Sequence, residues 1–557
     1  MSRSETGPEQ APISVSPDVI ERLEDIFSSL NTGDAPGLNV GVMHKGRVLF
    51  RRGYGLASAE LGVVNQPATR MRIGSTSKQF TCLAVMLLNE EQKIDIDEDI
   101  RSVLPELKIE GDALSARQLM QHTGGLRCHL DLWTLLTGMT GRFPDEEPFN
   151  LMCRLRSRNF RPGEDFIYCN GGYVLLAEMV ARVSQVPFGS FLRERIFAPL
   201  GMVDTELLGR DGDIVPRNAH LHVRTSSGGW RRGHMLLPLG GEGGLISTVD
   251  DMLLWLRHMD RPIVGSSATW AAMMSRTHLC SGGVSDYGLG LIMRDYRGVS
   301  TIGHAGAVLG GLSEMVKVPA HRLDISILAN RSDVKVADLA KKIIDVVLEK
   351  ELGPKSLPPA RFAPFDGLYR QPRTGQVIRL ATEQDIPIVD FGSAKASLLH
   401  RDDEAVVFSG ALGEMEFRRV GHELQSDGLD VMDCGVVQRF ERLADSGVSG
   451  DTGPLVAHYH NDEVPASADI RCEGDAVYLL LRTHFGRVSY LLTKLGDDLW
   501  RATYADGSSP AWFAVEIERE QAEIVAISLS SMRTRRLRFV RAGFQLSTAP
   551  IGAGMRH

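Results

Sequence analysis

The segment Arg72-Ile73-Gly74-Ser75-Thr76-Ser77-Lys78-Gln79-Phe80 decides the fold of this chain, because it leads a serine and a lysine into an apolar helix. The next residues, 81–88, are apolar almost all round, a pattern that predicts a buried helix. Ser75 and Lys78 are three residues apart and therefore neighbours on the first helical turn. Burial lowers the pKa of a lysine toward neutrality, so Lys78 can take the proton of the serine hydroxyl. Because free N–H groups at a helix start stabilise anions, the segment predicts a nucleophile, its base and part of an oxyanion hole.

The same Ser-x-x-Lys spacing recurs at Ser332-Asp333-Val334-Lys335, so the motif alone decides nothing. There the serine follows an expected strand and precedes an expected helix, and we interpret it as a helix N-cap. Assigning catalysis to Ser75 therefore needs further partners elsewhere in the chain.

Length and composition describe a globular protein of several domains. The 557 residues exceed one ordinary core, and 43% hydrophobic with 24% charged residues is a globular composition. The net charge of −8 gives no general attraction to nucleic acid or to an anionic membrane, so we expect neither as a partner. The basic run 533–536 lies in strand-like sequence, and we predict that it forms a solvated face.

The sequence predicts a cytoplasmic protein that uses no metal and no cofactor. Residues 1–16 are polar and acidic without an apolar core of a signal peptide, and no run of about 20 apolar residues follows. The seven cysteines are scattered without a C-x-x-C pair, which is typical of free thiols in a reducing compartment. No His, Cys and Asp cluster has metal-ligand spacing, and no phosphate-binding glycine loop is present.

The first part of the chain mixes helical and strand patterns, which predicts a mixed sheet covered by helices. Helical periodicity marks residues 17–30, 115–120, 173–183, 249–258 and 336–350, and strand patterns mark 38–43, 47–50, 288–294, 312–318 and 324–329. Beyond a proline-rich break the helical patterns disappear, and short alternating stretches with Gly and Asp turns predict all-β structure.

This all-β part contains an internal repeat. Gly367-Leu368-Tyr369-Arg370 resembles residues 457–460, and Arg439-Phe440-Glu441-Arg442 resembles residues 538–541. A repeat of this length predicts two copies of one small antiparallel barrel, each with about eight strands.

We therefore divide the chain into three domains joined by two linkers. The first domain spans residues 1–352, and the two barrels span residues 360–445 and 454–557. The linkers are residues 353–359, which are rich in proline, and residues 446–453, which are rich in Gly, Ser and Asp.

Two further motifs offer partners for Ser75 and Lys78. In Tyr168-Cys169-Asn170 the tyrosine can relay a proton, and the amide can bind both the lysine and a substrate carbonyl. In His304-Ala305-Gly306-Ala307, the glycine on a strand would let substrate approach, and the Ala307 N–H can be a second oxyanion donor. Taken alone, Tyr168 would be interpreted as a buried tyrosine whose hydroxyl has a hydrogen-bond partner. The His-x-Gly pattern is weak by itself, because it recurs at three other places in the chain.

In the order Ser-x-x-Lys, Tyr-x-Asn, His-x-Gly, these motifs resemble the penicillin-recognising serine hydrolases. Residues 194–202 and 243–248 are similar to that superfamily as well. The resemblance implies an α/β (α+β) β-lactamase-like catalytic domain with an antiparallel sheet, followed by two all-β antiparallel eight-stranded barrel domains. The catalytic residues would be Ser75, Lys78, Tyr168 and His304, with Asn170, Gly306 and Ala307 binding the substrate or its oxyanion.

The three-domain order resembles the bacterial D-aminopeptidases more closely. That resemblance implies release of N-terminal D-residues, above all D-alanine, from peptides, amides and esters by a metal-independent cytoplasmic homodimer, with β-lactams as inhibitors. It also implies that loop 504–510 reaches the active site, where Asp506 would meet the substrate ammonium. The chain departs from the family by having His304-Ala305-Gly306 instead of His-Gly-Gly, and residues 309–312 lack the expected arginine and tryptophan.

Three functions remain open at this point. The first is a D-aminopeptidase. The second is a related β-lactamase-fold esterase, amidase or D,D-carboxypeptidase, which keeps the Ser75 chemistry without needing Asp506. The third is a binding or sensor protein that retains the fold without catalysis.

Overall fold

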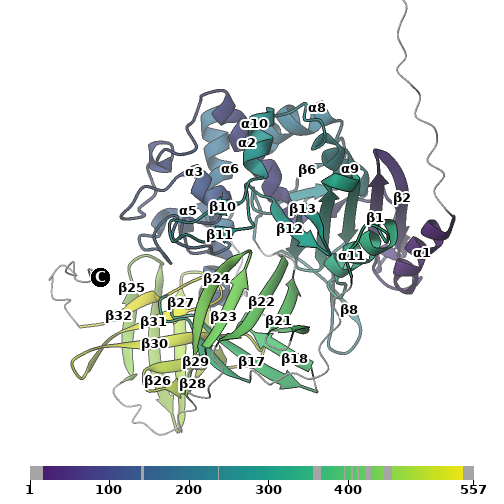
Figure 1. Ribbon diagram of the computed structural model, residues 1–557. Helices are drawn as coiled ribbons and strands as arrows, with labels where there is room; N and C mark the ends of the chain where they lie inside the picture. The colour runs from purple at the N-terminus through teal and green to yellow at the C-terminus, as the bar shows by residue number, and fades with distance from the viewer. Residues whose placement is uncertain are drawn as a thin grey trace, which may run out of the picture.

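The computed structural model places two β-rich domains beside a larger domain of mixed helices and strands (Figure 1). It describes residues 17–138, 144–235, 237–354, 366–384, 386–393, 395–402, 405–410, 413–420, 428–444 and 455–543. Within these residues, no helix combines the length and the apolarity needed to cross a membrane.

The helix-and-strand domain is built on a six-stranded sheet in the order β12-β13-β14-β15-β1-β2. Every pairing in it is antiparallel, so the mixed sheet expected from the sequence pattern is wrong and the antiparallel sheet implied by the family resemblance is confirmed. The first and last parts of this domain meet in the sheet, because β1 pairs with β15 along its whole length. The strands are β1 (Leu38–His44), β2 (Arg47–Tyr54), β12 (Ile292–Tyr296), β13 (Val299–Val308), β14 (Gly311–Val318) and β15 (Leu323–Ala329).

Helices cover both faces of the sheet, and its central strands β1, β14 and β15 are buried on both sides. Side chains such as Val40 and Val42 pack against α1 (Pro17–Phe27) and α11 (Val336–Val347) on one face. On the other face lies α9 (Val249–His258), whose Leu253 side chain comes within 3.0 Å of the position that a Cβ on Gly41 would take. The glycine in β1 thus lets α9 approach the sheet closely.

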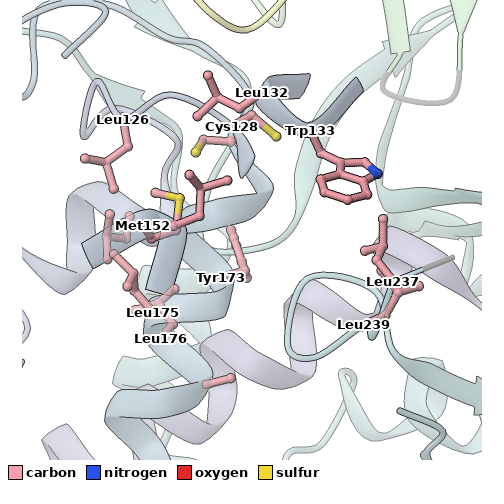
Figure 2. Close-up of a cluster of buried hydrophobic side chains, with 14 of the residues drawn as sticks. Leu126, Cys128, Leu132, Trp133, Met152, Tyr173, Leu175, Leu176, Leu237 and Leu239 are labelled. Atoms are coloured by element: carbon pink, nitrogen blue, oxygen red, sulfur yellow. The ribbon is translucent and has the colours of Figure 1, made fainter. Parts of the chain in front are cut away.

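A helical region holds the Ser75 segment and packs around α2 (Lys78–Glu90), which is buried from Lys78 to Leu88 as predicted. Figure 2 shows part of this core, including Met152, Tyr173 and Leu175. The other helices are α3 (Ala116–Met120), α4 (His129–Thr137), α5 (Glu147–Arg154), α6 (Asn170–Ser184), α7 (Phe188–Leu192), α8 (Ala198–Leu200) and α10 (Ser267–Met273). Short strands complete this domain: β3 (Leu56–Ser58), β4 (Val63–Val64), β5 (Met71–Arg72), β6 (Glu206–Leu207), β7 (His222–Arg224), β8 (Trp230–Arg232), β9 (Leu245–Ser247), β10 (Thr277–His278) and β11 (Val284–Ser285).

The two β-rich domains confirm the predicted pair of antiparallel barrels. The first barrel is nearly closed. Its two edge strands, β19 and β20, follow one another in the chain with only Leu398 between them, so together they occupy the position of one strand of an eight-stranded barrel. Its strands are β16 (Gly367–Arg370), β17 (Val377–Glu383), β18 (Ile386–Asp390), β19 (Lys395–Ser397), β20 (Leu399–Asp402), β21 (Ala405–Gly410), β22 (Gly413–Val420), β23 (Gly428–Asp433) and β24 (Val436–Arg442). The second is a closed barrel of β25 (Ala457–Asn461), β26 (Ala466–Glu473), β27 (Ala476–Thr483), β28 (Gly486–Gly496), β29 (Leu499–Tyr504), β30 (Trp512–Glu520), β31 (Glu523–Ser530) and β32 (Leu537–Arg541).

The internal repeat marks the seam at which each barrel joins its first and last strands. Tyr369 pairs with Arg442 in the first barrel, and Tyr459 pairs with Arg541 in the second. The two repeated tetrapeptides are therefore equivalent strands in two copies of one architecture. The proposed linkers lie largely outside the described residues, so the domain boundaries stay predictions.

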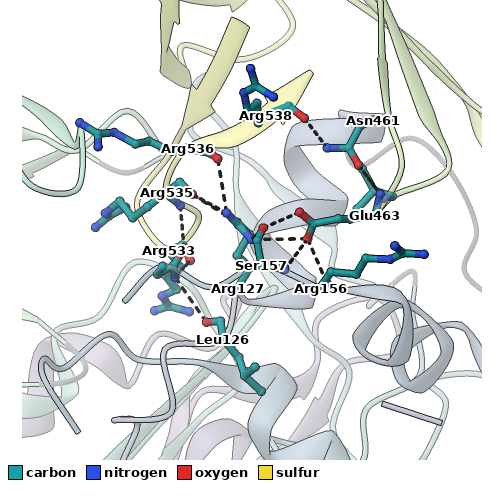
Figure 3. Close-up of polar contacts among 12 residues, drawn as sticks. Leu126, Arg127, Arg156, Ser157, Asn461, Glu463, Arg533, Arg535, Arg536 and Arg538 are labelled. Carbon is teal, nitrogen blue, oxygen red and sulfur yellow. Dashed lines mark hydrogen bonds and ion pairs between the residues drawn. The ribbon is translucent and has the colours of Figure 1, made fainter. Parts of the chain in front are cut away.

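The loop 531–536, which joins β31 to β32, lies against the helix-and-strand domain (Figure 3). It also contacts the first barrel, because the Arg535 guanidinium donates to Gln376 Oε1 at 2.6 Å. The Arg127 guanidinium donates to the Arg535 carbonyl at 3.0 Å, and the Asn159 amide donates to the Arg533 carbonyl at 3.0 Å. The prediction that this basic run forms a solvated face is wrong, since Thr534 is 0% and Arg535 is 4% exposed. The sequence pattern missed this because burial here comes from domain packing and not from the loop's own composition.

Candidate active site

Ser75 lies in a 3-10 turn, Gly74–Ser77, that leads directly into α2. Its side chain is partly exposed, whereas Lys78 is completely buried. The Lys78 ammonium donates to Ser75 Oγ at 3.2 Å, to Asn170 Oδ1 at 2.8 Å and to the Glu242 carbonyl oxygen at 2.5 Å. The lysine is thus held against the serine hydroxyl by two further acceptors.

The surroundings of Lys78 suit a base. Burial lowers the pKa of Lys78 to about 7, while the Glu242 carboxylate raises it and the Arg533 guanidinium lowers it further. A large fraction of the lysine is therefore neutral near pH 7 and able to accept the Ser75 proton.

Replacing Glu242 by Gln is expected to move the acidic limb of the kcat/KM profile to lower pH. Only neutral Lys78 accepts a proton, so wild-type activity should fall as the pH drops below about 7. Because the Glu242 carboxylate raises that pKa, its removal lowers the pKa and extends activity into acid. The measurement is kcat/KM between about pH 5 and 9 for wild type, Glu242→Gln and the exposed control Glu194→Gln. A flat wild-type profile, or a limb that moves to higher pH, would contradict this assignment.

Tyr168 and Asn170 reach the site from the segment that begins α6, since Asn170 is the first residue of that helix. The Tyr168 ring lies 4.9 Å from Lys78 Nζ and 4.1 Å from the His122 ring. Burial raises the pKa of Tyr168, and the adjacent Ser75 hydroxyl acts against that shift. The Tyr168 hydroxyl has no partner at hydrogen-bond geometry among the described residues, which argues against the alternative of a buried tyrosine with a satisfied hydroxyl.

His304 lies on β13 and is 1% exposed. Its Nδ1 lies 2.6 Å from the Ala305 carbonyl oxygen and its Nε2 lies 2.9 Å from the Tyr287 hydroxyl. Nδ1 therefore donates and Nε2 accepts, since a carbonyl oxygen only accepts. Burial, with Lys78 nearby, lowers the pKa of His304 to about 3, so the ring is neutral near pH 7.

The His-x-Gly motif brings β13 directly against the serine turn. A Cβ on Gly306 would lie 1.9 Å from the Ile73 carbonyl oxygen, and a Cβ on Gly74 would lie 2.8 Å from the Ala307 nitrogen. The space that a side chain at position 306 would need is thus filled by the Ile73 carbonyl, and the approach of substrate to this strand stays a prediction. This packing places the Ala307 backbone beside the turn that carries Ser75.

The structure does not bring Asp506 together with these residues through any described contact. Asp506 is exposed, and its Oδ1 accepts a hydrogen bond from Ser508 N at 2.9 Å. At the start of its loop, Tyr504 donates to the Thr134 carbonyl at 3.5 Å. The second barrel instead presents Arg533, whose guanidinium carbon lies 4.9 Å from the centre of the Tyr168 ring.

Sequence reasoning missed four residues around this site: His122, Glu242, Tyr287 and Arg533. Glu242 lies in the Gly240–Gly244 run, whose glycines were a usable signal for a close backbone approach. Tyr287 and Arg533 carry no motif, because only tertiary packing brings them to His304 and Tyr168. In the described part of the chain, no group of three or more His, Cys, Asp and Glu side chains is arranged to hold a metal ion.

The fold and the gathered motifs together define a penicillin-recognising serine hydrolase. Residues 23–348, more than half of the chain, match the family model described as Beta-lactamase, and the chain belongs to this family.

Two curated relatives are similar to this chain over nearly its whole length. The D-aminopeptidase of Brucella ovis is 26% identical over 533 residues, covering 91% of this chain and 96% of that protein. The D-aminopeptidase of Brucella anthropi is 26% identical over 537 residues, covering 91% and 95%.

Solved structures share the fold at lower sequence identity. The octameric penicillin-binding protein homologue from Pyrococcus abyssi has a TM-score of 0.54 at 18% identity, covering 94% of this chain and 99% of that one. The D-amino acid amidase from Ochrobactrum anthropi SV3, complexed with L-phenylalanine amide, has a TM-score of 0.52 at 22% identity and covers 60% and 99%.

Proposed function

We propose that this protein is a serine hydrolase that acts through an acyl-serine intermediate. The observation that carries the proposal is the 3.2 Å contact between Ser75 Oγ and the buried amine of Lys78. Ser75 attacks the substrate carbonyl and its proton passes to Lys78. The N–H groups of Ser75 and Ala307 stabilise the oxyanion, and Tyr168 or Lys78 returns a proton to the leaving group. Water then releases the acyl group, and no step requires a metal or a cofactor.

The substrate class that we propose is a peptide, amide or ester with an N-terminal D-residue, D-alanine favoured. The full-length D-aminopeptidase relatives support this choice, because their similarity extends over the barrels as well as the catalytic domain. Release of free D-alanine from D-alanyl-p-nitroanilide tests it directly.

The second candidate is a related esterase, amidase or D,D-carboxypeptidase that does not require a free amine. The charges near the site favour this candidate. Asp506 is exposed and makes no described contact with the site residues, whereas the Arg533 guanidinium of the second barrel lies against the Tyr168 ring. An ammonium would be repelled by that cation, whereas a blocked or anionic substrate would not.

If Asp506 binds the substrate ammonium, Asp506→Asn is expected to raise KM for a D-alanyl ester by about tenfold, the loss of one charge-assisted hydrogen bond. The N-acetyl form of the same ester should be unaffected, since it has no ammonium. The measurement is kcat/KM for both esters in wild type and Asp506→Asn, with Asp497→Asn as an exposed control. Equal effects on both esters would assign the protein to the second candidate.

We further propose a cytoplasmic homodimer whose serine is acylated by β-lactams. The fold relative from Pyrococcus abyssi is an octamer, so the assembly of this chain needs its own measurement by sedimentation.

A further inference from the structure

The first barrel encloses a cavity of about 360 Å³ that ends at the catalytic domain. Its wall is the apolar interior of the barrel, formed by side chains such as Ile378, Phe391, Phe408 and Phe440. At one end the cavity is lined by Tyr168, the same ring that lies against Lys78. A molecule in the barrel can therefore touch a residue of the catalytic group without occupying Ser75.

The charged side chains that line this cavity are mainly basic. Arg533 and Arg535, both from loop 531–536, line it together with Lys395, whereas Asp433 is the acidic residue of the lining. Neither arginine has a carboxylate within ion-pair distance among the described residues, although Lys395 pairs with Glu383. The Arg535 side chain is 4% exposed, and its guanidinium donates to the Ser531 carbonyl and to Gln376 Oε1, while its Nε has no hydrogen-bond partner there. A buried guanidinium with no carboxylate in contact and one N–H left over can take an anionic ligand.

We propose that this cavity binds a small molecule with an apolar chain or ring and one carboxylate, with the carboxylate on Arg533 and Arg535. The apolar part would lie among the aromatic side chains of the barrel, in the manner of pockets that combine an apolar wall with a few polar anchors. Two sources offer this chemistry: the leaving group of the substrate, which ends in a carboxylate when a peptide is cleaved, and a separate aliphatic acid.

Calorimetric titration of the full chain with octanoate and octanamide tests the site, using Ser75→Ala so that no turnover is needed. Octanoate is expected to bind about tenfold more tightly than octanamide, and Arg533→Gln should abolish this preference. Ala396→Trp, which fills the cavity from β19, should weaken both ligands. The matched control is Arg536→Gln, an exposed arginine of the same loop that lies outside the lining. Absent octanoate binding, or binding unchanged in Ala396→Trp, would overturn the proposal.

A kinetic comparison then separates the two sources, and only this arm rests on the proposed function. If the leaving group enters the cavity, octanoate competes with D-alanyl-L-leucine, and Arg533→Gln raises KM for that dipeptide more than for D-alanyl-L-leucinamide. If the ligand is a separate acid, octanoate binds without competing and both substrates respond equally. Because the calorimetry uses an inactive variant, a wrong proposed function leaves its result intact.

Discussion

Ser75→Ala is expected to lower kcat at least about a thousandfold while the melting temperature stays near that of wild type. The substitution deletes a single oxygen whose described hydrogen bond comes from Lys78. Losing one such bond costs about 1 kcal/mol of the free energy of unfolding, far less than the effect on the reaction. The measurements are kcat on a D-alanyl ester and the thermal unfolding transition of the same preparation.

The second Ser-x-x-Lys motif provides the matched control. The expected N-cap at Ser332 is wrong, because α11 begins at Val336 and Ser332 Oγ instead accepts from Arg224 N at 3.0 Å. Ser332 is exposed, so Ser332→Ala should keep wild-type activity. If Ser75→Ala retains more than about a tenth of the wild-type rate, the serine mechanism is wrong.

Lys78→Met is expected to reduce kcat by a similar factor, and the double variant with Ser75→Ala should be no slower than either single one. Nucleophile and base act as one unit, so their losses are not additive. Methionine fills the buried space but cannot accept a proton, and it leaves Asn170 Oδ1 and the Glu242 carbonyl without this donor. We therefore expect the free energy of unfolding to fall by about 1–3 kcal/mol.

Lys317→Met separates loss of stability from loss of catalysis. Lys317 is a second buried lysine, on β14, and it pairs with buried Asp324 at 2.8 Å. Removing it leaves a buried carboxylate unpaired, which costs about 3–5 kcal/mol. At a temperature where both variants are folded, Lys317→Met should keep its kcat and Lys78→Met should not. Equal kcat values in the two variants would remove Lys78 from the mechanism.

The sequence predicted those site residues whose position follows from local structure. Ser75 and Lys78 meet because residues three apart are neighbours on a helical turn, whereas Asn170 was assigned to the site from the Tyr-x-Asn motif, and its amide oxygen contacts Lys78. The two barrels were predicted from the alternating pattern and the repeat, the antiparallel sheet was implied by the family resemblance, and both are confirmed. Gly306 was recognised as a close-approach position, but the approaching group is the Ile73 carbonyl.

The contribution of the second barrel could not be read from local sequence. An Asp-Gly turn at residues 506–507 looked like a reaching loop, yet it has the local bonding of a hairpin tip. Arg533 lies in a run that resembled a solvated strand face, and its contact with Tyr168 depends on how three domains pack. Interdomain packing has no periodicity, so a single sequence offers no signal for it.

The most direct test of the acyl-serine mechanism is the mass of the protein during turnover. The full chain is mixed with a D-alanyl ester, quenched in acid, and analysed whole and after digestion. The acyl-serine mechanism predicts one added D-alanyl group on the peptide that contains Ser75, and none in Ser75→Ala. An acyl group on another peptide, or continued turnover by Ser75→Ala, would contradict it.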